Sequence, residues 1–148
     1  MTPDAAVARD AIRHTMARYN IAGDRGQLAA LAATFAPDGT LEIDQGSATG
    51  PDAIVRLLER LTADFKGGLT LCRHNLTTSL IDLTGSDSAE GRTYFNVMTD
   101  IGPDHSGVYA DRFRRTGDCW LFAHRRVRID WAAPNSLMLP GGLPKRRA

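Results

Sequence analysis

The second half of the chain is built from long segments with strand character, and only short polar turns separate them. The turns read "TGSDS", "GPD" and "RTGD". Turns this short join strands that lie next to each other in an antiparallel sheet. The sequence therefore predicts a run of hairpins, and the first half of the chain must supply the layer that covers one face of their sheet. The predicted strands span residues 69–83, 89–101, 105–115 and 119–131.

Apolar residues recur at helical spacing near the start of the chain. Thr2 can cap a first helical turn, and Pro3 fits there because the first backbone N–H groups of a helix have no partner within it. A helix is therefore predicted from there to about Ile21, with Gly23 ending it. The apolar stripe of this helix consists of Ala8, Ile12, Met16 and Tyr19.

A second, short helix is predicted to open at Asp24, because Gln27 stands three residues later in a capping-box arrangement. Its apolar positions are Leu28, Leu31, Ala32 and Phe35. The turn signal "PDG" follows, and after it we expect a brief strand at 40–44 and a loop at 45–50.

A third helix is predicted with Pro51 in its first turn and "KGG" at its end. Its apolar stripe consists of Ile54, Leu57, Leu58, Leu61 and Phe65. Helices followed by long antiparallel strands are typical of an α+β domain whose helices cover one face of a curved sheet. We expect one such domain at 1–131, because 148 residues suffice for a single stable core. The Pro- and Gly-rich residues 132–148 are expected to form an extended or flexible tail.

The charge and hydropathy of the chain exclude several classes of partner. The 18 Lys and Arg residues balance 17 Asp and Glu residues, so neither nucleic acid nor an anionic membrane is expected to bind. No apolar run approaches the length of a membrane span, and the N-terminus lacks the pattern of a signal peptide. Two cysteines, without a disulfide or zinc spacing, fit a reducing cytoplasm.

The histidines give no metal-binding pattern. They are His14, His74, His105 and His124. Because none stands in an H-x-H or H-E-x-x-H spacing, neither a metal nor another cofactor is expected. Cys72 would point the same way as His74 along a strand, but no other part of a thiol-enzyme motif accompanies it.

Arginine is concentrated in the last predicted hairpin. The residues are Arg112, Arg114, Arg115, Arg125, Arg126 and Arg128. The favoured interpretation is a solvated or ion-paired outer face. The alternative is a site for an anionic group or for acidic residues across a subunit interface.

Four stretches of the chain form a recognisable series. They read "YNIAGDRGQLAALAATFAPDGTLEID", "GPDAI", "RHNLTTSLIDL" and "GVYADRFRRTGDCWLFAHRRVRIDW". Together they resemble the SnoaL-like branch of the nuclear transport factor two-like superfamily, from about residue 8 to 131. The resemblance implies a cone-shaped α+β barrel, with three N-terminal helices packed on a strongly curved mixed β-sheet around a deep apolar pocket. The superfamily includes dehydratases, isomerases, polyketide cyclases, oxygenase subunits and binding proteins without chemistry.

Scytalone dehydratase-like and bile acid dehydratase-like members remove water from a cyclic substrate with a His–Asp pair helped by a tyrosine. The resemblance places the acid at Asp24 in "GDRGQL", the histidine at His74 in "CRHNL" and the tyrosine at Tyr19. It implies catalytic roles for these three residues.

The chain departs from those enzymes in two places. Gly23 stands where they have a tyrosine beside the acid, and counting back from "FRRTGDCW" puts their second histidine at Ser106, one residue from His105. A slip of one residue along a strand reverses the face to which a side chain points.

His74 lies in a run that reads as a buried strand, and two interpretations are open. As a core residue it would need only one hydrogen bond. As a proton-transfer group in a pocket, it could take a proton from carbon and return one to a leaving hydroxyl near neutral pH. Asp24 would then orient the imidazole, or it could simply cap a helix. Tyr19 could donate its phenol hydrogen to a substrate or belong to the core.

Further candidates for substrate binding lie on the predicted strands. Tyr109 shares a strand face with Asp111 and Phe113 and could form part of a pocket wall. Asp100 and His105 flank a predicted turn, where exposed residues most often have no role beyond solvation.

These observations predict a cofactor-independent cytoplasmic dehydratase that acts on a hydrophobic cyclic alcohol, either steroid-like or polyketide-like. One alternative is an isomerase or polyketide cyclase that uses the same base. Another is a non-catalytic ligand-binding protein or subunit. A homodimer is expected, and a trimer, as in the scytalone-type enzymes, is the alternative.

Overall fold

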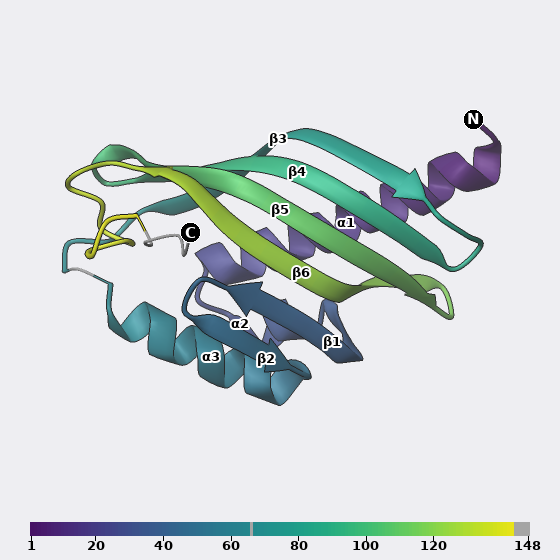
Figure 1. Cartoon of the computed structure of the whole chain (residues 1–148), viewed down its shortest axis with the longest axis horizontal. Coiled ribbons are helices and arrows are strands. Elements are labelled where there is room, and N and C mark those ends of the chain that lie inside the picture. Colours follow the sequence, from purple (N-terminus) through teal and green to yellow (C-terminus); the bar gives the residue numbers. More distant parts are fainter. Residues whose placement is uncertain (66, 144–148) are drawn as a thin grey trace, which may run out of the picture.

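The computed structural model describes residues 1–65 and 67–143. In this part of the chain three helices pack on one six-stranded sheet (Figure 1). The helices are α1 (Pro3–Asp24), α2 (Leu28–Ala32) and α3 (Pro51–Ala63). The strands are β1 (Phe35–Ile43), β2 (Gly46–Thr49), β3 (Cys72–Leu83), β4 (Ser88–Thr99), β5 (Gly102–Thr116) and β6 (Cys119–Ala132).

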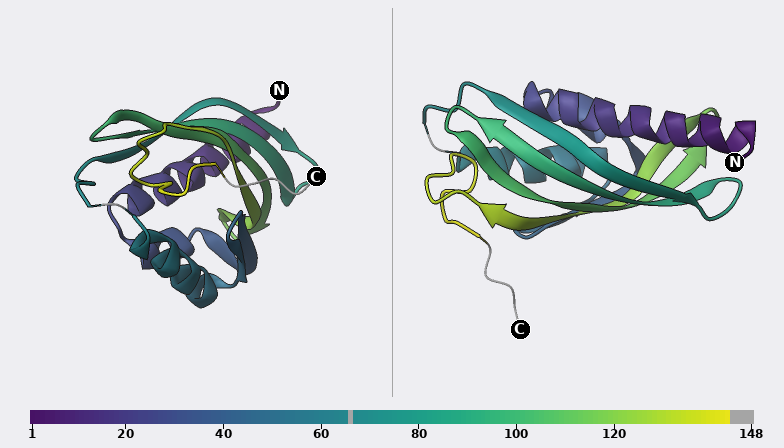
Figure 2. Two further views of the ribbon diagram at one scale, coloured as in Figure 1. Left: turned by 60° about the vertical axis from the view of Figure 1, so that its left-hand side comes forward. Right: turned by 90° about the horizontal axis from the view of Figure 1, so that it is seen from above.

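The strand order in the sheet is β2-β1-β6-β5-β4-β3. The pair β1–β6 is parallel and the other neighbouring pairs are antiparallel, so the sheet is mixed. Its twist curls it around the helices without closing it (Figure 2). Helix α1 contacts β3 and β6, whereas α3 contacts β1 and β2. The predicted fold class, α+β with helices on one face of a strongly curved mixed sheet, is confirmed.

The hydrophobic core fills the space between the helices and the concave face of the sheet. Ile12 and Met16 of α1, Ile54 of α3, and Val97 and Phe122 of the sheet are almost completely buried. Burying one such side chain contributes about 1.5–3 kcal/mol. Within residues 1–65 and 67–143, no helix has the length and hydropathy needed to span a membrane.

The junction of the first two helices differs from the prediction. Helix α1 continues through Gly23 to Asp24, and the chain then turns at Gly26, which has a positive φ of 69°. The expected capping box at Asp24 is wrong, because α2 begins at Leu28 and its N-cap Gln27 makes no side-chain capping hydrogen bond. The carboxylate of Asp24 has other donors, on β3.

The bounds of several other elements also differ from the prediction. The predicted loop at 45–50 contains β2, which pairs with β1. Strand β1 begins at Phe35, a residue that the apolar spacing places in the second helix. Helix α3 ends at Ala63, before "KGG", of which residue 66 lies outside the described residues. The predicted turn "GPD" lies inside β5, because Gly102, with φ 91°, turns the chain sharply and strand pairing resumes at once.

β-Bulges decide which side chains face the helices. In β5, Asp104 has no cross-strand partner on β4 between Pro103 and His105, and both Asp104 and His105 are buried. In β6, Ala123 is left without a partner on β5, and beyond it Arg125 faces the interior. The alternation of side chains therefore changes phase inside these strands, which a sequence pattern of period two does not predict.

Candidate active site

Asp24 and His74 lie side by side where α1 contacts β3. Asp24 is the last residue of α1 and His74 lies near the start of β3. Asp24 Oδ1 is 2.6 Å from Nδ1 of His74, and Asp24 Oδ2 accepts a 3.0 Å hydrogen bond from the backbone N–H of His74. An ionised carboxylate only accepts hydrogen bonds, so the ring proton is on Nδ1 and the lone pair is on Nε2. The contact thus fixes the orientation and the tautomer of the imidazole.

The surroundings of Asp24 keep it ionised. Burial would raise its pKa, but hydrogen bonds from the ring and backbone of His74 and from the thiol of Cys72 hold the pKa below its ordinary value. The Cys72 sulfur lies 3.5 Å from Asp24 Oδ1 and 3.7 Å from His74 Nδ1. Burial and the charge of Asp24 raise the pKa of Cys72 to about 12. The thiol is therefore protonated at neutral pH and is a poor nucleophile.

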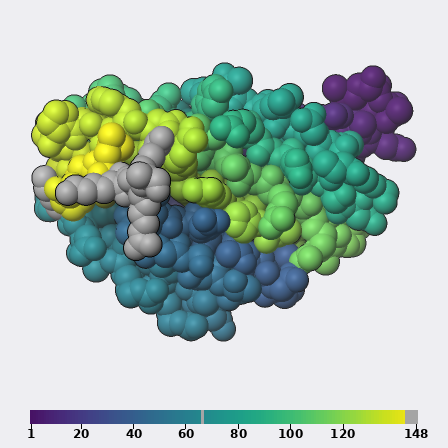
Figure 3. Space-filling model, in the orientation of Figure 1, coloured from purple at the N-terminus to yellow at the C-terminus, as the bar shows by residue number. Residues whose placement is uncertain are grey.

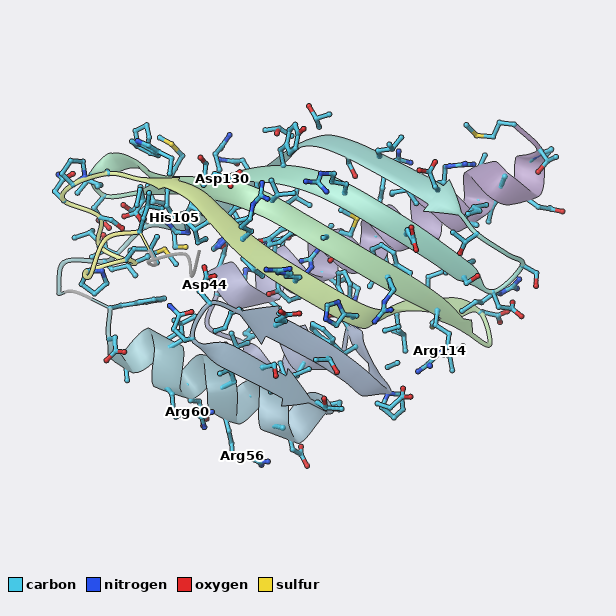
Figure 4. The ribbon with its side chains drawn as sticks, viewed as in Figure 1. Asp44, Arg56, Arg60, His105, Arg114 and Asp130 are labelled. Carbon is cyan, nitrogen blue, oxygen red and sulfur yellow. The ribbon has the colours of Figure 1, made fainter. Side chains whose placement is uncertain are left out.

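A second Asp–His pair, Asp104 and His105, lies near the first pair, at the start of β5 (His105 is labelled in Figure 4). Asp104 Oδ1 is 2.6 Å from Nδ1 of His105. Asp104 is completely buried and also accepts hydrogen bonds from Thr99 Oγ1 (3.1 Å), Ser136 Oγ (2.6 Å) and the backbone N–H of Leu137 (2.8 Å). Burial lowers the pKa of His105, and the hydrogen bond to Asp104 opposes this only in part, so the ring is neutral at pH 7.

The ring of Phe95 lies beside both histidine rings, and the three rings form a triangle. Its centroid is 6.2 Å from that of His74, 6.3 Å from that of His105 and 4.3 Å from that of Tyr109, on which it stacks. The two imidazole centroids are 6.2 Å apart, edge to face. Gly107 makes room for Phe95, because a Cβ there would lie 3.0 Å from the ring and 2.0 Å from a carbonyl oxygen of β6. The two histidines therefore face a common space.

That space is a cavity of about 330 Å³, lined by all three helices, the sheet and the C-terminal segment. Its walls are mainly apolar, and they include Met138 and Leu139 of the C-terminal segment. In the space-filling view, the described part of this segment, in yellow, lies at the left-hand end of the molecule (Figure 3). The polar groups that face the cavity include Tyr19, Asn20, Asp24, His74, His105 and Tyr109.

The structure brings most of the predicted site residues together. Tyr19, Asp24, His74, His105 and Tyr109 all line the cavity. The expectation that His105 is an exposed turn residue is wrong, because the bulge in β5 turns it inward and leaves it 5% exposed.

Two other positions considered for the site lie elsewhere. Ser106, the position that simple counting assigned to the second histidine, lines a different hollow. Asp100 is exposed in the turn between β4 and β5 and does not line the cavity. Its carboxylate accepts hydrogen bonds from the side chain and backbone of Thr70 and the backbone of Leu71, which lower its pKa to about 2. These contacts hold the segment before β3 in place.

The sequence matches the family described as "SnoaL-like domain" over residues 4–126, which is most of the chain. The chain belongs to the SnoaL-like domain family. No curated protein matches it.

Several solved structures have the same fold as this SnoaL-like domain. A Catenulispora acidiphila protein in complex with S-DNPA is 28% identical, with 84% of this chain and 95% of that chain covered and a TM-score of 0.73. A putative scytalone dehydratase from Novosphingobium aromaticivorans is 24% identical, with 100% and 99% covered and a TM-score of 0.76. The hexachlorocyclohexane dehydrochlorinase LinA-type3 from Novosphingobium barchaimii is 19% identical, with 88% and 92% covered and a TM-score of 0.76. At 24% and 19% identity, the likeness to the last two shows the fold.

A buried ion pair that the sequence did not predict contacts two tyrosines that line the cavity of this SnoaL-like domain. Arg125 and Asp111 are buried and joined by two hydrogen bonds of 2.8 Å. The guanidinium group also lies 4.3 Å from the ring centroid of Tyr19 and 3.8 Å from that of Tyr109. The prediction of a solvated or ion-paired outer face therefore fails for Arg125. Its signal in the sequence was Asp111, a charged residue between two aromatic residues on one strand face, which requires a buried cation as partner.

The contact of Asn20 with Tyr109 was also not predicted from the sequence. Its side-chain nitrogen donates a 3.1 Å hydrogen bond to the hydroxyl of Tyr109. Burial raises the pKa of both Tyr19 and Tyr109, so both phenols remain protonated. Because the Tyr109 oxygen accepts from Asn20, its own hydrogen is free to donate. An asparagine inside a helical stripe gave no pattern that predicts this contact.

Proposed function

We propose that the protein is a cofactor-independent dehydratase that removes water from a small, apolar cyclic alcohol. The observation that carries the proposal is the 2.6 Å contact between Asp24 Oδ1 and His74 Nδ1 at the wall of an apolar cavity of about 330 Å³. A carboxylate that fixes the tautomer of a histidine is the arrangement that makes the other ring nitrogen a general base. The match to the SnoaL-like domain family supports a protein that acts on small molecules.

In the proposed reaction, Nε2 of His74 takes a proton from a carbon of the substrate. The electron pair of that C–H bond forms the new C=C bond, and the neighbouring C–O bond breaks. The imidazolium then returns its proton to the departing oxygen, so water leaves and His74 is neutral again. Asp24 stabilises the imidazolium while it exists. Because one imidazole serves both positions, the departing hydrogen and hydroxyl are expected on the same face of the substrate ring.

His105 is assigned a supporting role. Its ring is neutral and Nδ1–H donates to Asp104, which leaves Nε2 as an acceptor for a substrate hydroxyl. A neutral neighbour 6.2 Å away also avoids like-charge repulsion when His74 becomes positive. Tyr109 is proposed to donate its free hydroxyl hydrogen to a substrate oxygen, and Tyr19 remains a candidate for the same task.

The cavity size favours a polyketide-like over a steroid-like substrate. A cavity of roughly 150 Å³ holds one benzene molecule. The present cavity, about 330 Å³, is roughly twice as large and suits two fused rings. A four-ring steroid would need the C-terminal segment or the helices to move.

A panel of bicyclic and steroidal alcohols, followed by mass and ultraviolet spectra, tests the proposal. Loss of one water from a bicyclic alcohol is the expected result. An unchanged mass with a shifted spectrum would indicate an isomerase or cyclase instead, and binding without turnover would indicate a ligand-binding protein.

The matched pair of variants for this test is His74→Gln and His124→Gln. His124 bonds Glu42 at 3.1 Å and does not line the cavity. His74→Gln is expected to lower turnover by about 10²–10⁴-fold, the usual contribution of a general base, and His124→Gln to leave it intact. Full activity in His74→Gln would contradict the mechanism.

The homodimer and the cytoplasmic location stay predictions, and analytical ultracentrifugation tests the first.

A further inference from the structure

The thiol of Cys72 has no task in the proposed reaction, yet it lies against the two groups that do. Its sulfur is 3.5 Å from Asp24 Oδ1 and 3.7 Å from His74 Nδ1. The three residues offer one oxygen, one sulfur and one nitrogen, all within 4.8 Å of one another. Cys72 and Asp24 are distant in sequence, so no ligand spacing could have predicted this group.

The triangle formed by these atoms is close to that of a tetrahedral zinc site. Zinc bonds of about 2.3 Å to sulfur and about 2.0–2.1 Å to nitrogen and oxygen place two ligand atoms roughly 3.3–3.6 Å apart. The two edges that meet at sulfur, 3.5 and 3.7 Å, already have this length. Only the Asp24–His74 edge, 2.6 Å, must open, by roughly 0.7 Å, as the hydrogen bond is replaced by two metal bonds.

The ligand types and surroundings also suit a soft divalent ion. Thiolate and imidazole select zinc and softer metals over magnesium and calcium. The thioether sulfur of Met138 lies 3.6 Å from the Cys72 sulfur, so a further soft atom lies beside the three ligands. The side chains of Asp24 and His74 are 10% and 19% exposed, so the group is shielded and still reachable from the cavity.

We propose that Asp24, Cys72 and His74 form a binding site for Zn²⁺ or a similarly soft divalent cation, and that the bound ion switches the enzyme off. On binding, the S–H bond of Cys72 breaks and its proton goes to solvent. The N–H bond at Nδ1 of His74 breaks as well, and Nε2 takes up a proton. One proton is released in all, and the charges of one carboxylate and one thiolate balance the ion.

The inhibitory part of this inference rests on the proposed function. With the metal on Nδ1, the remaining ring proton is on Nε2, so the nitrogen that faces the substrate has no lone pair. The ion also takes Asp24 away from its orienting contact. Metal binding and catalysis are therefore mutually exclusive at this site.

The binding test uses the full chain, freed of metal and titrated with Co²⁺ and then with Zn²⁺. Binding of one equivalent of Co²⁺ with a thiolate charge-transfer band is expected, and Zn²⁺ should displace it. Cys119→Ser is the matched control, because Cys119 is the other cysteine and is exposed. It should keep the band, whereas Cys72→Ser and Cys72→Ala should lose it. Their affinity should fall by more than the roughly 10–100-fold that loss of an outer-shell partner costs.

Several results would overturn the metal site. They are absence of a band in the wild type, a band that survives in both Cys72 variants, and loss of the band in Cys119→Ser. The spectra need no substrate, so they decide metal binding whether or not the proposed reaction is found. Once a substrate is known, one equivalent of Zn²⁺ should inhibit the wild type and Cys119→Ser at concentrations that leave Cys72→Ala unaffected. Equal zinc sensitivity in Cys72→Ala would contradict the switch while leaving the proposed reaction intact.

Discussion

The two Asp–His pairs of this protein have the same contact and different surroundings. In each, a carboxylate oxygen lies 2.6 Å from Nδ1 of the histidine. The side chains of His74 and Asp24 are 19% and 10% exposed, whereas those of His105 and Asp104 are 6% and 0% exposed. The first carboxylate serves mainly its own histidine, and the second also receives donors from three other residues. The difference suggests that the first pair is arranged to exchange protons and the second to hold its neighbours in place.

The position of each pair in the chain supports this division. Asp24 and His74 join the end of α1 to β3, and both residues line the cavity. Asp104 joins β4, β5 and the C-terminal segment through Thr99, His105 and Ser136. Loss of the first carboxylate should therefore affect the reaction more than the fold, and loss of the second should affect the fold more than the reaction.

The largest expected effect is that of Asp24→Asn on turnover. An amide group at this position can donate to Nδ1 and so favour the tautomer with the proton on Nε2, which has no lone pair for the substrate. We expect kcat/KM to fall by about 10³–10⁴-fold, as in a Ser-His-Asp triad whose acid is replaced by an amide. The free energy of unfolding should change by only about 1 kcal/mol. Steady-state kinetics and urea denaturation measure the two quantities.

Asp104→Asn is expected to show the opposite balance. Ser136 and His105 both donate to Oδ1 of Asp104, and Thr99 and the backbone of Leu137 both donate to Oδ2, so an amide nitrogen would oppose two donors. Unsatisfied buried donors cost about 1–3 kcal/mol each, so the free energy of unfolding should fall by roughly 2–6 kcal/mol.

The activity of Asp104→Asn should fall less than that of Asp24→Asn, by roughly 10–100-fold, because His105 only supports the proposed reaction. The comparison of the two pairs would break down if Asp24→Asn were the less stable variant, or if Asp104→Asn were the less active one.

The part of the fold that the sequence predicted depends on regular periodicity. The helical stripe around Ile12 and Met16 and the long strands that end in polar turns are repeated patterns, and each repetition strengthens the prediction. The bounds that failed, such as the start of β1 at Phe35, lie where tertiary pairing overrides a short local pattern.

The candidate site could be predicted only in part, for a related reason. Asp24 and His74 stand in stretches that resemble the family, and local sequence sufficed to locate them. Asp104 and Arg125 lie at or after β-bulges, and a bulge changes which face of a strand carries a side chain. In "GPD" the aspartate reads as a turn residue, and only the completed sheet shows that it is buried.

A smaller effect is expected when single hydrogen bonds to Asp104 are removed, one from the C-terminal segment and one from β4. Ser136→Ala removes a donor on the C-terminal segment, and Thr99→Val removes a donor on β4, from the same carboxylate. Ser136→Ala also removes the acceptor of the Leu139 backbone N–H, so it should cost about 2 kcal/mol of stability and Thr99→Val about 1 kcal/mol. Only Ser136→Ala should speed amide hydrogen exchange at Leu137, whose N–H donates to Asp104, by roughly fivefold. Equal effects of the two variants on exchange at Leu137 would show that Asp104 does not fasten this segment in particular.

The smallest effect concerns the pH dependence of stability. Burial holds the pKa of His105 below the value of about 6.5 expected in the unfolded chain. As pH falls below about 6.5, His105 therefore becomes protonated in the unfolded chain while it stays neutral in the native protein. The contribution of His105 to stability is complete above that pH and declines below it, until the native pKa is reached. Asp104 opposes this shift, and its own pKa is lowered by its donors, so it remains ionised throughout this range.

In Asp104→Asn the pKa of His105 should consequently fall further, and the decline should extend to lower pH. Urea denaturation across this range measures the slope, and His105→Gln should remove it. An NMR titration of the His105 ring gives the pKa directly. If that pKa rose in Asp104→Asn, the carboxylate of Asp104 would not be the group that raises the pKa of His105 against the effect of burial. The contrast between the two pairs would then need another physical basis.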